Sequence, residues 1–156
     1  MDQLERWIDE AHNLGLTVRF KEFKSGAKGI IKGKKIGIRE GMPRLETACI
    51  LAEEIGHYHL TVGDILNQSK ITNRKQELLA RRWSFERLVP LSAIVQAHIQ
   101  GIRNRHELAR MLDITEDILQ QAIDRYIEKY GLSVPVGRYT VIFEPLGVME
   151  LFDFDY

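Results

Sequence analysis

The sequence predicts an α+β fold, in which a small antiparallel sheet lies between helices and a helical region follows Pro90. Two observations lead to this prediction. Apolar residues near the N-terminus recur at helical spacing, whereas the next segments are short β-rich runs separated by glycines. After Pro90 only helical patterns continue until a final alternating stretch. We therefore expect a core at residues 1–90, a helical region at 91–131 and an acidic tail at 132–156 that forms two strands packing on the core.

The size and composition are those of a soluble globular protein. The chain has 156 residues, of which 44% are hydrophobic and 28% charged, enough for a genuine core. Cys49 is the only cysteine, which excludes an intramolecular disulfide and fits a reducing cytosol. The N-terminus has no basic leader, and no apolar run approaches the roughly 20 residues that a membrane span needs. We expect a cytoplasmic protein without a membrane partner.

The first half of the chain predicts one helix and a small sheet. The helix covers residues 4–14 and ends at Gly15, a residue typical of helix C-termini. Three short β segments follow, at residues 17–23, 28–33 and 34–40. Their short connections predict hairpin turns, and therefore an antiparallel sheet.

The remaining elements are predicted mainly from helix start and stop signals. Pro43 suits the first turn of a helix that runs to about residue 59. Residues 61–72 are expected to form a loop, and Asn73 begins another helix that ends near Pro90. Further helices are expected at residues 91–100, 105–112 and 116–130, and two strands around residues 145–147.

The stretch LAEEIGHYHL, residues 51–60, differs by one letter from the H-E-x-x-H signature of zinc peptidases. Glu53 and His57 are i, i+4 neighbours on one helix face, so both can reach one atom. Glu54 points aside, where a base could reach a metal-bound water without being a ligand. A solvated acidic face that ends in a histidine would give the same letters, so this helix alone leaves both interpretations open.

Neighbouring side chains have structural interpretations beside the functional ones. His59 falls on the apolar stripe, where a histidine usually belongs to the core. Cys49 offers a further ligand, although a single small cysteine is more often a packing residue. Tyr58 is a candidate oxyanion donor or a packing residue, and Asp64 either supports His57 or forms a turn.

The helix that follows the motif carries a resemblance to a known family. The sequence resembles the ImmA/IrrE metallopeptidases, in which the motif helix is followed by a helix reading roughly E-x-x-A-x-x-F-A-x-x-L-L-M-P. The matching positions here are Glu77, Ala80, Trp83, Ser84, Arg87, Leu88, Val89 and Pro90. The resemblance covers about residues 1–130 and is closest to the phage and mobile-element branch, where A-E-E-x-G-H-Y is a recognisable form of the motif. It implies a zincin-like metallopeptidase core.

Carried over by position, the resemblance implies that Glu53, His57 and Glu77 hold the metal and that Glu54 is the general base. Glu53 stands where the family has histidine. A site with two carboxylates carries less positive charge, so its water should lose a proton at higher pH, and Zn²⁺ faces competition from Mn²⁺. Arg81, four residues after Glu77, either orients that ligand or forms an ordinary ion pair with it.

The function implied by the resemblance is metal-dependent endopeptidase activity, with a helix-turn-helix repressor of a phage or mobile element as the protein substrate. The alternative is a catalytically weak or inactive member that binds a repressor or antirepressor partner without cleaving it. The replacement of the first histidine by Glu53 keeps this alternative open.

Charge is distributed unevenly along a chain whose formal net charge is zero. Residues 16–45 hold nine basic side chains against Glu22 and Glu40. This segment is either a surface for nucleic acid or an acidic partner, or it is neutralised within the fold and protects strand edges. We favour the second account because aromatic residues do not alternate with the basic ones. Residues 107–123 resemble a helix-turn-helix, but the second helix begins with the acidic segment 115–117, which disfavours direct nucleic-acid binding.

Overall fold

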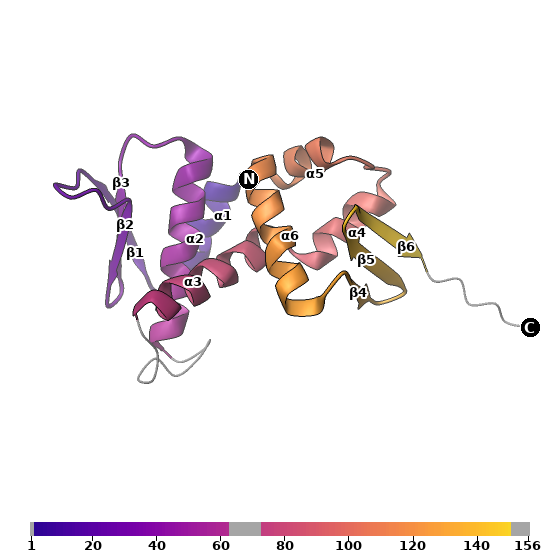
Figure 1. Ribbon diagram of the computed structural model, residues 1–156. Helices are drawn as coiled ribbons and strands as arrows, with labels where there is room; N and C mark the ends of the chain where they lie inside the picture. The colour runs from indigo at the N-terminus through magenta and orange to yellow at the C-terminus, as the bar shows by residue number, and fades with distance from the viewer. Residues whose placement is uncertain (1, 63–72, 151–156) are drawn as a thin grey trace, which may run out of the picture. The chain divides into compact units, whose positions relative to one another are not determined.

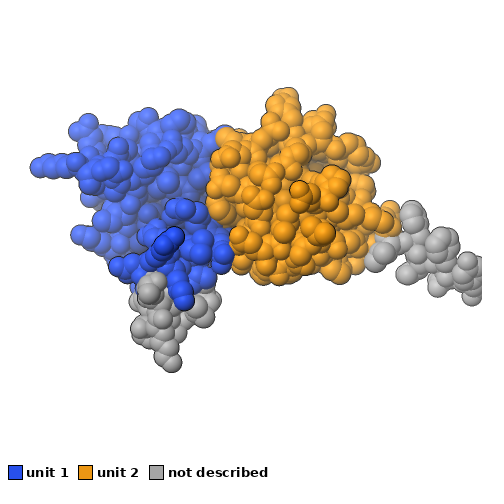
Figure 2. Space-filling model, in the orientation of Figure 1, with its two compact units in different colours: residues 1–84 blue, residues 85–156 orange. Residues whose placement is uncertain are grey.

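A computed structural model describes residues 2–62 and 73–150 of the chain (Figure 1). The chain forms two compact units, residues 1–84 and 85–156 (Figure 2). Each unit combines helices with a three-stranded sheet, which confirms the predicted α+β class. Among the described helices, none combines the length and apolarity that crossing a lipid bilayer requires.

The first unit begins with a capped helix. Its elements are α1 (Gln3–Asn13), β1 (Thr17–Lys21), β2 (Gly29–Lys32), β3 (Lys35–Arg39), α2 (Arg44–Thr61) and most of α3 (Asn73–Leu88). Asp2 and Glu5 form a capping box at the start of α1, where each side chain accepts a hydrogen bond from the other's backbone N–H at 2.9 and 3.0 Å. Gly15, with φ +77°, follows the helix end. The predicted helices and β segments are confirmed, and residues 63–72 of the expected loop lie outside the described residues.

The sheet of the first unit is mixed, which corrects the expectation of an antiparallel sheet. The strand order is β1-β3-β2, and β3 pairs parallel with β1 and antiparallel with β2. Residues 22–28 carry the chain past the position of β3, and a hairpin turn at Gly33 (φ +59°) then inserts β3 between the other two strands. Alternation of apolar residues assigns side chains to a face, but it is the same for either strand direction.

Helix α2 lies against one face of this sheet (Figure 1) and contacts β2 and β3. The core between them contains Ile36 and Ile38 from β3 and Leu51 and Ile55 from α2, all with at most 1% of their surface exposed. Helix α1 packs on α2 as well. The central strand β3 and the motif helix therefore share one core, and the motif side chains that face away from it remain partly exposed.

Helices α2 and α3 approach each other closely at Gly56. A Cβ atom built on Gly56 would lie 2.7 Å from the carbonyl oxygen of Ala80 and 3.1 Å from the Trp83 ring. Ala80 is fully buried. The Trp83 ring packs between Trp7, with ring centroids 5.8 Å apart, and His59, with centroids 4.9 Å apart. Only a residue without a side chain permits this contact.

The second unit contains the predicted helices and one more strand than expected. Its elements are α4 (Leu91–Ile99), α5 (Arg105–Leu112), α6 (Glu116–Tyr130), β4 (Ser133–Val136), β5 (Tyr139–Phe143) and β6 (Leu146–Glu150). Asn104 and Thr115 cap α5 and α6 through side-chain oxygens. The two expected strands are β5 and β6. Strand β4 was not expected because Pro135 lies inside it, and a proline argues against a strand unless the strand is at an edge, as β4 is.

The sheet β4-β5-β6 is antiparallel throughout and contacts α4 and α6. The ring of Phe143 stacks on that of Tyr126 with centroids 5.5 Å apart. The Tyr126 hydroxyl donates to the carbonyl oxygen of Val89 at 2.7 Å. The tail strands thus share a core with the helices of the second unit.

We predict that Gly56→Ala lowers the free energy of unfolding by about 2 kcal/mol, because the added methyl group would overlap the Ala80 carbonyl. Helix propensity alone would favour alanine at this position by about 1 kcal/mol. Urea unfolding checks the sign. The matched control is Gly26→Ala, which adds the same methyl group in open space. A Gly56→Ala variant as stable as the wild type, or more stable, would contradict the close contact.

Candidate metal centre

Helices α2 and α3 bring three side chains with metal-binding atoms together. Glu53 and His57 lie one turn apart on α2, and Glu77 comes from the first part of α3. One ligand atom from each can be chosen so that all three lie within 4.8 Å of one another. The i, i+4 spacing on α2 predicted the first pair. The third residue joins it because α3 crosses α2 at Gly56, next to His57.

The three side chains differ in exposure. The side chains of Glu53 and His57 are 18% and 16% exposed, whereas that of Glu77 is 60% exposed. Nε2 of His57 lies 3.4 Å from Oε2 of Glu77. The two α2 residues therefore form a recessed base, and Glu77 forms the side that is open to solvent.

Glu54 lies in the same cavity as His57 and Glu77. This cavity has a volume of about 310 Å³ and is also lined by Gly29 and Thr61. Burial, together with the negative charges of Glu53 and Glu77, raises the pKa of Glu54 to about 7. A carboxyl group with a pKa near neutrality can both accept and return a proton, as a general base must.

Gly29 makes room for the Glu54 carboxylate. A Cβ atom on Gly29 would lie 2.6 Å from Cγ2 of Ile50 and 3.0 Å from Oε1 of Glu54. Gly29 begins the edge strand β2, whose residues Ile30 and Ile31 also line the cavity. The role of this glycine is not predictable from the sequence, because the segment indicates only that a strand begins there and not which helix side chain lies opposite.

Arg81 contacts a different ligand candidate from the one expected. Its Nη2 atom lies 3.6 Å from Oε1 of Glu53, across the helix pair, whereas the i, i+4 spacing had paired it with Glu77. Burial raises the pKa of Glu53, and the adjacent Arg81 opposes this shift. Arg81 thus restrains the carboxylate that stands at the first position of the H-E-x-x-H signature.

Tyr58, His59 and Cys49, the other candidates among the described residues, take no part in the group of three ligand atoms. Tyr58 makes an edge contact with the ring of His59, with centroids 5.6 Å apart. His59 packs on Trp83, as a core histidine does. Burial raises the pKa of the Cys49 thiol to about 11, with further contributions from Glu46 and Glu53, so the neutral packing form predominates at neutral pH. Asp64 lies outside the described residues.

The basic segment divides into paired residues and an exposed sheet face. Lys28 pairs with Glu46, and Arg44 with Asp2, each at 2.7 Å. A hollow of about 160 Å³ on one sheet face is lined by Arg19, Lys21, Ile30, Lys32, Lys35, Ile36 and Gly37. Lys32 lies on the edge strand, as expected for a residue that protects a sheet edge.

Helices α5 and α6 are joined by a turn at residues 113–115, in which Asp113 has the left-handed conformation. The polar residues that begin α6 are engaged locally, since Glu116 lies 3.5 Å from His106 and Asp117 accepts a hydrogen bond from Gln121. The first turn of α6 therefore remains acidic, as the sequence indicated.

Comparison with known families gives one match. Residues 11–124 match the model of a peptidase family described as the IrrE N-terminal-like domain, which is more than half of the chain. The matched range includes all of α2 and α3, and therefore the group of three ligand atoms and Glu54. It ends within α6 and does not include the sheet β4-β5-β6. No curated protein matches the chain.

We predict that Glu54→Gln stabilises the metal-free protein at pH 8 by about 2 kcal/mol and has no effect near pH 4.5. The pKa of Glu54 rises from its ordinary 4.5 to about 7 in the folded state. Between these values the unfolded chain releases the proton and the folded chain retains it, so the wild type loses stability as the pH rises through this window. A glutamine side chain does not titrate in this range, so the variant does not lose stability as the pH rises.

Urea unfolding in the presence of a chelator, at pH values from 4.5 to 8, measures this difference. Glu40→Gln, at an exposed position outside the cavity, serves as the control. A stability difference between wild type and Glu54→Gln that stays constant across the pH range would contradict the raised pKa.

Proposed function

The chain belongs to the IrrE N-terminal-like peptidase family, and from this membership we propose that it is a metal-dependent endopeptidase that cleaves a helix-turn-helix repressor of a phage or mobile element. One observation carries the proposal. Glu53, His57 and Glu77 offer ligand atoms within 4.8 Å of one another, and Glu54 lines the same cavity as two of them. We assign the three residues to the metal and Glu54 to the general base.

The donor set fits a divalent cation. Two carboxylates and one imidazole are ordinary zinc ligands, and three protein ligands leave a position open for water or substrate. The 3.4 Å between His57 and Glu77 suits two donors of one tetrahedral zinc ion, which lie about 3.4 Å apart. Hard carboxylate oxygens also suit Mn²⁺, so we propose Zn²⁺ with Mn²⁺ as a competitor.

The chain's own residues supply the proton transfers. When bound, the cation supplies Lewis acidity, which acidifies water and polarises the peptide carbonyl. Glu54 accepts the proton of the attacking water on a carboxylate oxygen and returns it to the amide nitrogen as the peptide bond breaks. Arg81, 3.6 Å from Glu53, restrains the Glu53 carboxylate while Glu54 transfers the proton.

The edge strand β2 offers a binding surface for an extended peptide. Its outer edge has no strand partner in the described sheet, and Gly29, Ile30 and Ile31 line the cavity beside Glu54 and His57. A peptide that adds to this edge would be held by main-chain hydrogen bonds, which do not depend on its sequence. The assignment of a repressor as the substrate rests on the resemblance to the phage and mobile-element branch.

A second candidate function is binding of a repressor or antirepressor without cleavage. It is favoured by the position of Arg81, whose guanidinium already lies beside Glu53 and competes with a cation for that carboxylate. In this candidate function, the cavity lined by β2 and α2 binds the partner protein but does not cleave it. The two functions differ in whether the bound partner is cut.

We predict that the wild type binds Zn²⁺, that Glu77→Gln weakens binding at least tenfold, and that Glu53→His strengthens it about tenfold. Histidine would restore the first position of the H-E-x-x-H motif with a nitrogen ligand that suits zinc, and it would remove the carboxylate for which Arg81 competes with the cation. Calorimetric titration with Zn²⁺ and with Mn²⁺ measures the affinities. The preference for Zn²⁺ over Mn²⁺ should rise in Glu53→His.

The matched control for that substitution is Glu40→His, which makes the same change at an exposed position away from the site. The ligand assignment is wrong if Glu77→Gln binds as tightly as the wild type. The metal proposal fails if neither the wild type nor Glu53→His binds either ion.

We also predict that Glu54→Gln retains the metal affinity of the wild type and cleaves its repressor at least a hundredfold more slowly, because it removes only the base. The assay mixes the purified chain and Zn²⁺ or Mn²⁺ with a small repressor encoded by a neighbouring gene, and follows the fragments by mass spectrometry. Binding of the repressor by both proteins with no fragments from either would favour the second candidate function.

A further inference from the structure

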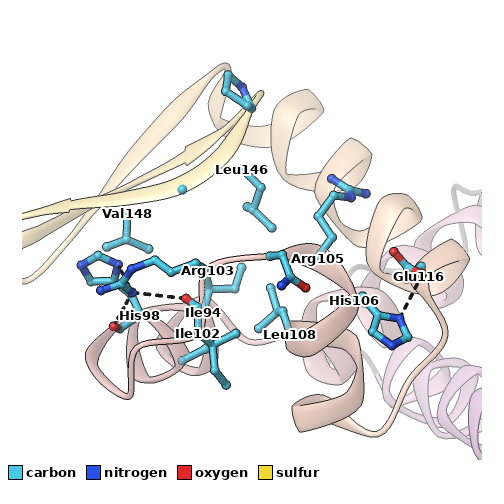
Figure 3. Close-up of a pocket in the computed structure, with 14 residues that line it drawn as sticks. Ile94, His98, Ile102, Arg103, Arg105, His106, Leu108, Glu116, Leu146 and Val148 are labelled. Atoms are coloured by element: carbon cyan, nitrogen blue, oxygen red, sulfur yellow. Dashed lines mark hydrogen bonds and ion pairs between the residues drawn. The ribbon is translucent and has the colours of Figure 1, made fainter.

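A cavity in the second unit has no role in the proposed peptidase reaction. It has a volume of about 790 Å³, and it is walled by α4, α5 and the hairpin of β5 and β6 (Figure 3). Cavities of this size bind small organic molecules in other proteins. The hairpin that forms one wall lies outside the range that matches the peptidase family, residues 11–124.

One part of the cavity is apolar. Ile94 and Leu108 are buried at its base, and Ile102, Leu146 and Val148 line its walls with partly exposed side chains. Figure 3 shows these side chains turned toward one another across the opening between the helices and the hairpin. An apolar group placed among them would leave water, which stabilises binding in proportion to the area buried.

The polar part of the cavity is cationic. Arg103 is held in place by donating through Nη1 to the carbonyl oxygens of His98, at 2.9 Å, and Ile102, at 3.3 Å. Arg105 donates to the side-chain oxygen of Gln120. Neither guanidinium pairs with a carboxylate anywhere in the described part of the chain, so their charges are uncompensated. A guanidinium has five N–H donors, and each of these two uses only one nitrogen.

The acidic residue of the lining does not offset these charges. Glu116 lies 3.5 Å from Nδ1 of His106, and Figure 3 places this pair at the opposite end of the cavity from Arg103. The first turn of α5, whose cap is Asn104, also lines the cavity and adds the positive end of the helix dipole. The end of the cavity at Arg103 therefore favours an anion.

We propose that this cavity binds a small amphipathic carboxylate, with its charged head at Arg103 and its apolar body on Ile94, Leu108 and Val148. Charge complementarity selects the anion, because a neutral apolar molecule would leave the Arg103 guanidinium without a charged partner. The enclosed apolar base selects a ligand with a hydrocarbon body, because a simple anion would leave that surface in contact with water.

The experiment compares three probes on the full-length protein: decanoate, its uncharged amide decanamide, and acetate. Methyl-resolved NMR titration measures the affinities and locates the binding site. We expect decanoate to bind at least tenfold more tightly than either other probe and to shift the methyl signals of Ile94, Leu108 and Val148. Raising the salt concentration should weaken decanoate binding and leave that of decanamide unchanged.

Two substitutions separate the head from the body of the ligand. Arg103→Gln should weaken decanoate binding about tenfold and leave decanamide binding unchanged. The matched control Arg138→Gln removes an arginine from the same unit but outside the cavity, and should have no effect. Val148→Phe fills the apolar part and should weaken both probes, with its fold checked by the NMR spectrum.

Several outcomes would overturn the proposal. Equal affinity for decanoate and decanamide would show that the site has no preference for an anion. NMR shifts confined to methyl groups outside the cavity would show that the ligand binds elsewhere. Occupation of the cavity by another protein segment would also contradict the proposal. The occupant is a second copy of the chain if decanoate affinity falls as protein concentration rises and a dimer is seen in sedimentation. It is residues 151–156 if decanoate binds only to a variant that ends at Glu150.

Discussion

The close contact of α2 with α3 at Gly56 is the constraint on which the proposed metal centre depends. The contact joins backbone to backbone, since the missing Cβ atom would lie 2.7 Å from the Ala80 carbonyl oxygen. Glu77 lies one turn before Ala80, and His57 directly follows Gly56. The point where the helices touch therefore also sets the 3.4 Å between the imidazole and the Glu77 carboxylate. The backbone contact between Gly56 and Ala80 thus determines both the packing of the two helices and the relative positions of His57 and Glu77.

That contact has an electrostatic consequence. It places Glu77 near Glu53 and Glu54, so three carboxyl groups crowd together, and burial with mutual repulsion raises the pKa of the last two. Arg81 lies 3.6 Å from Glu53 and offsets part of this negative charge. A divalent cation would offset more of it. The same repulsion that destabilises the metal-free site would thus favour cation binding, and Glu54 would respond most because it is not a ligand in the proposal.

Much of the fold was predictable from local signals, and the long-range arrangement was not. Gly15 follows the end of α1 because glycine readily adopts a positive φ, and Asn104 begins α5 because its side chain caps the helix. Such signals predicted the helices close to their observed bounds. The Glu53 and His57 pair follows from helix geometry alone. Glu77 required the resemblance, because nothing in α2 indicates which later residue crosses it. For the same reason Arg81 was expected to pair with Glu77. The i, i+4 spacing describes neighbours on one helix, whereas the carboxylate that Arg81 contacts, Glu53, lies on the other helix.

The free edge of β2 also has a consequence for the behaviour of the protein in solution. An unpaired strand edge that accepts an extended substrate would accept the β2 strand of another molecule equally well, and the outcome would be self-association. The strand is only four residues long, and Lys28 and Lys32 lie at its two ends. Two molecules joined edge to edge there would bring these lysines together. Lys28 is already paired with Glu46, so Lys32 would supply most of the repulsion, and the short edge would disfavour self-association while it stays available to other chains.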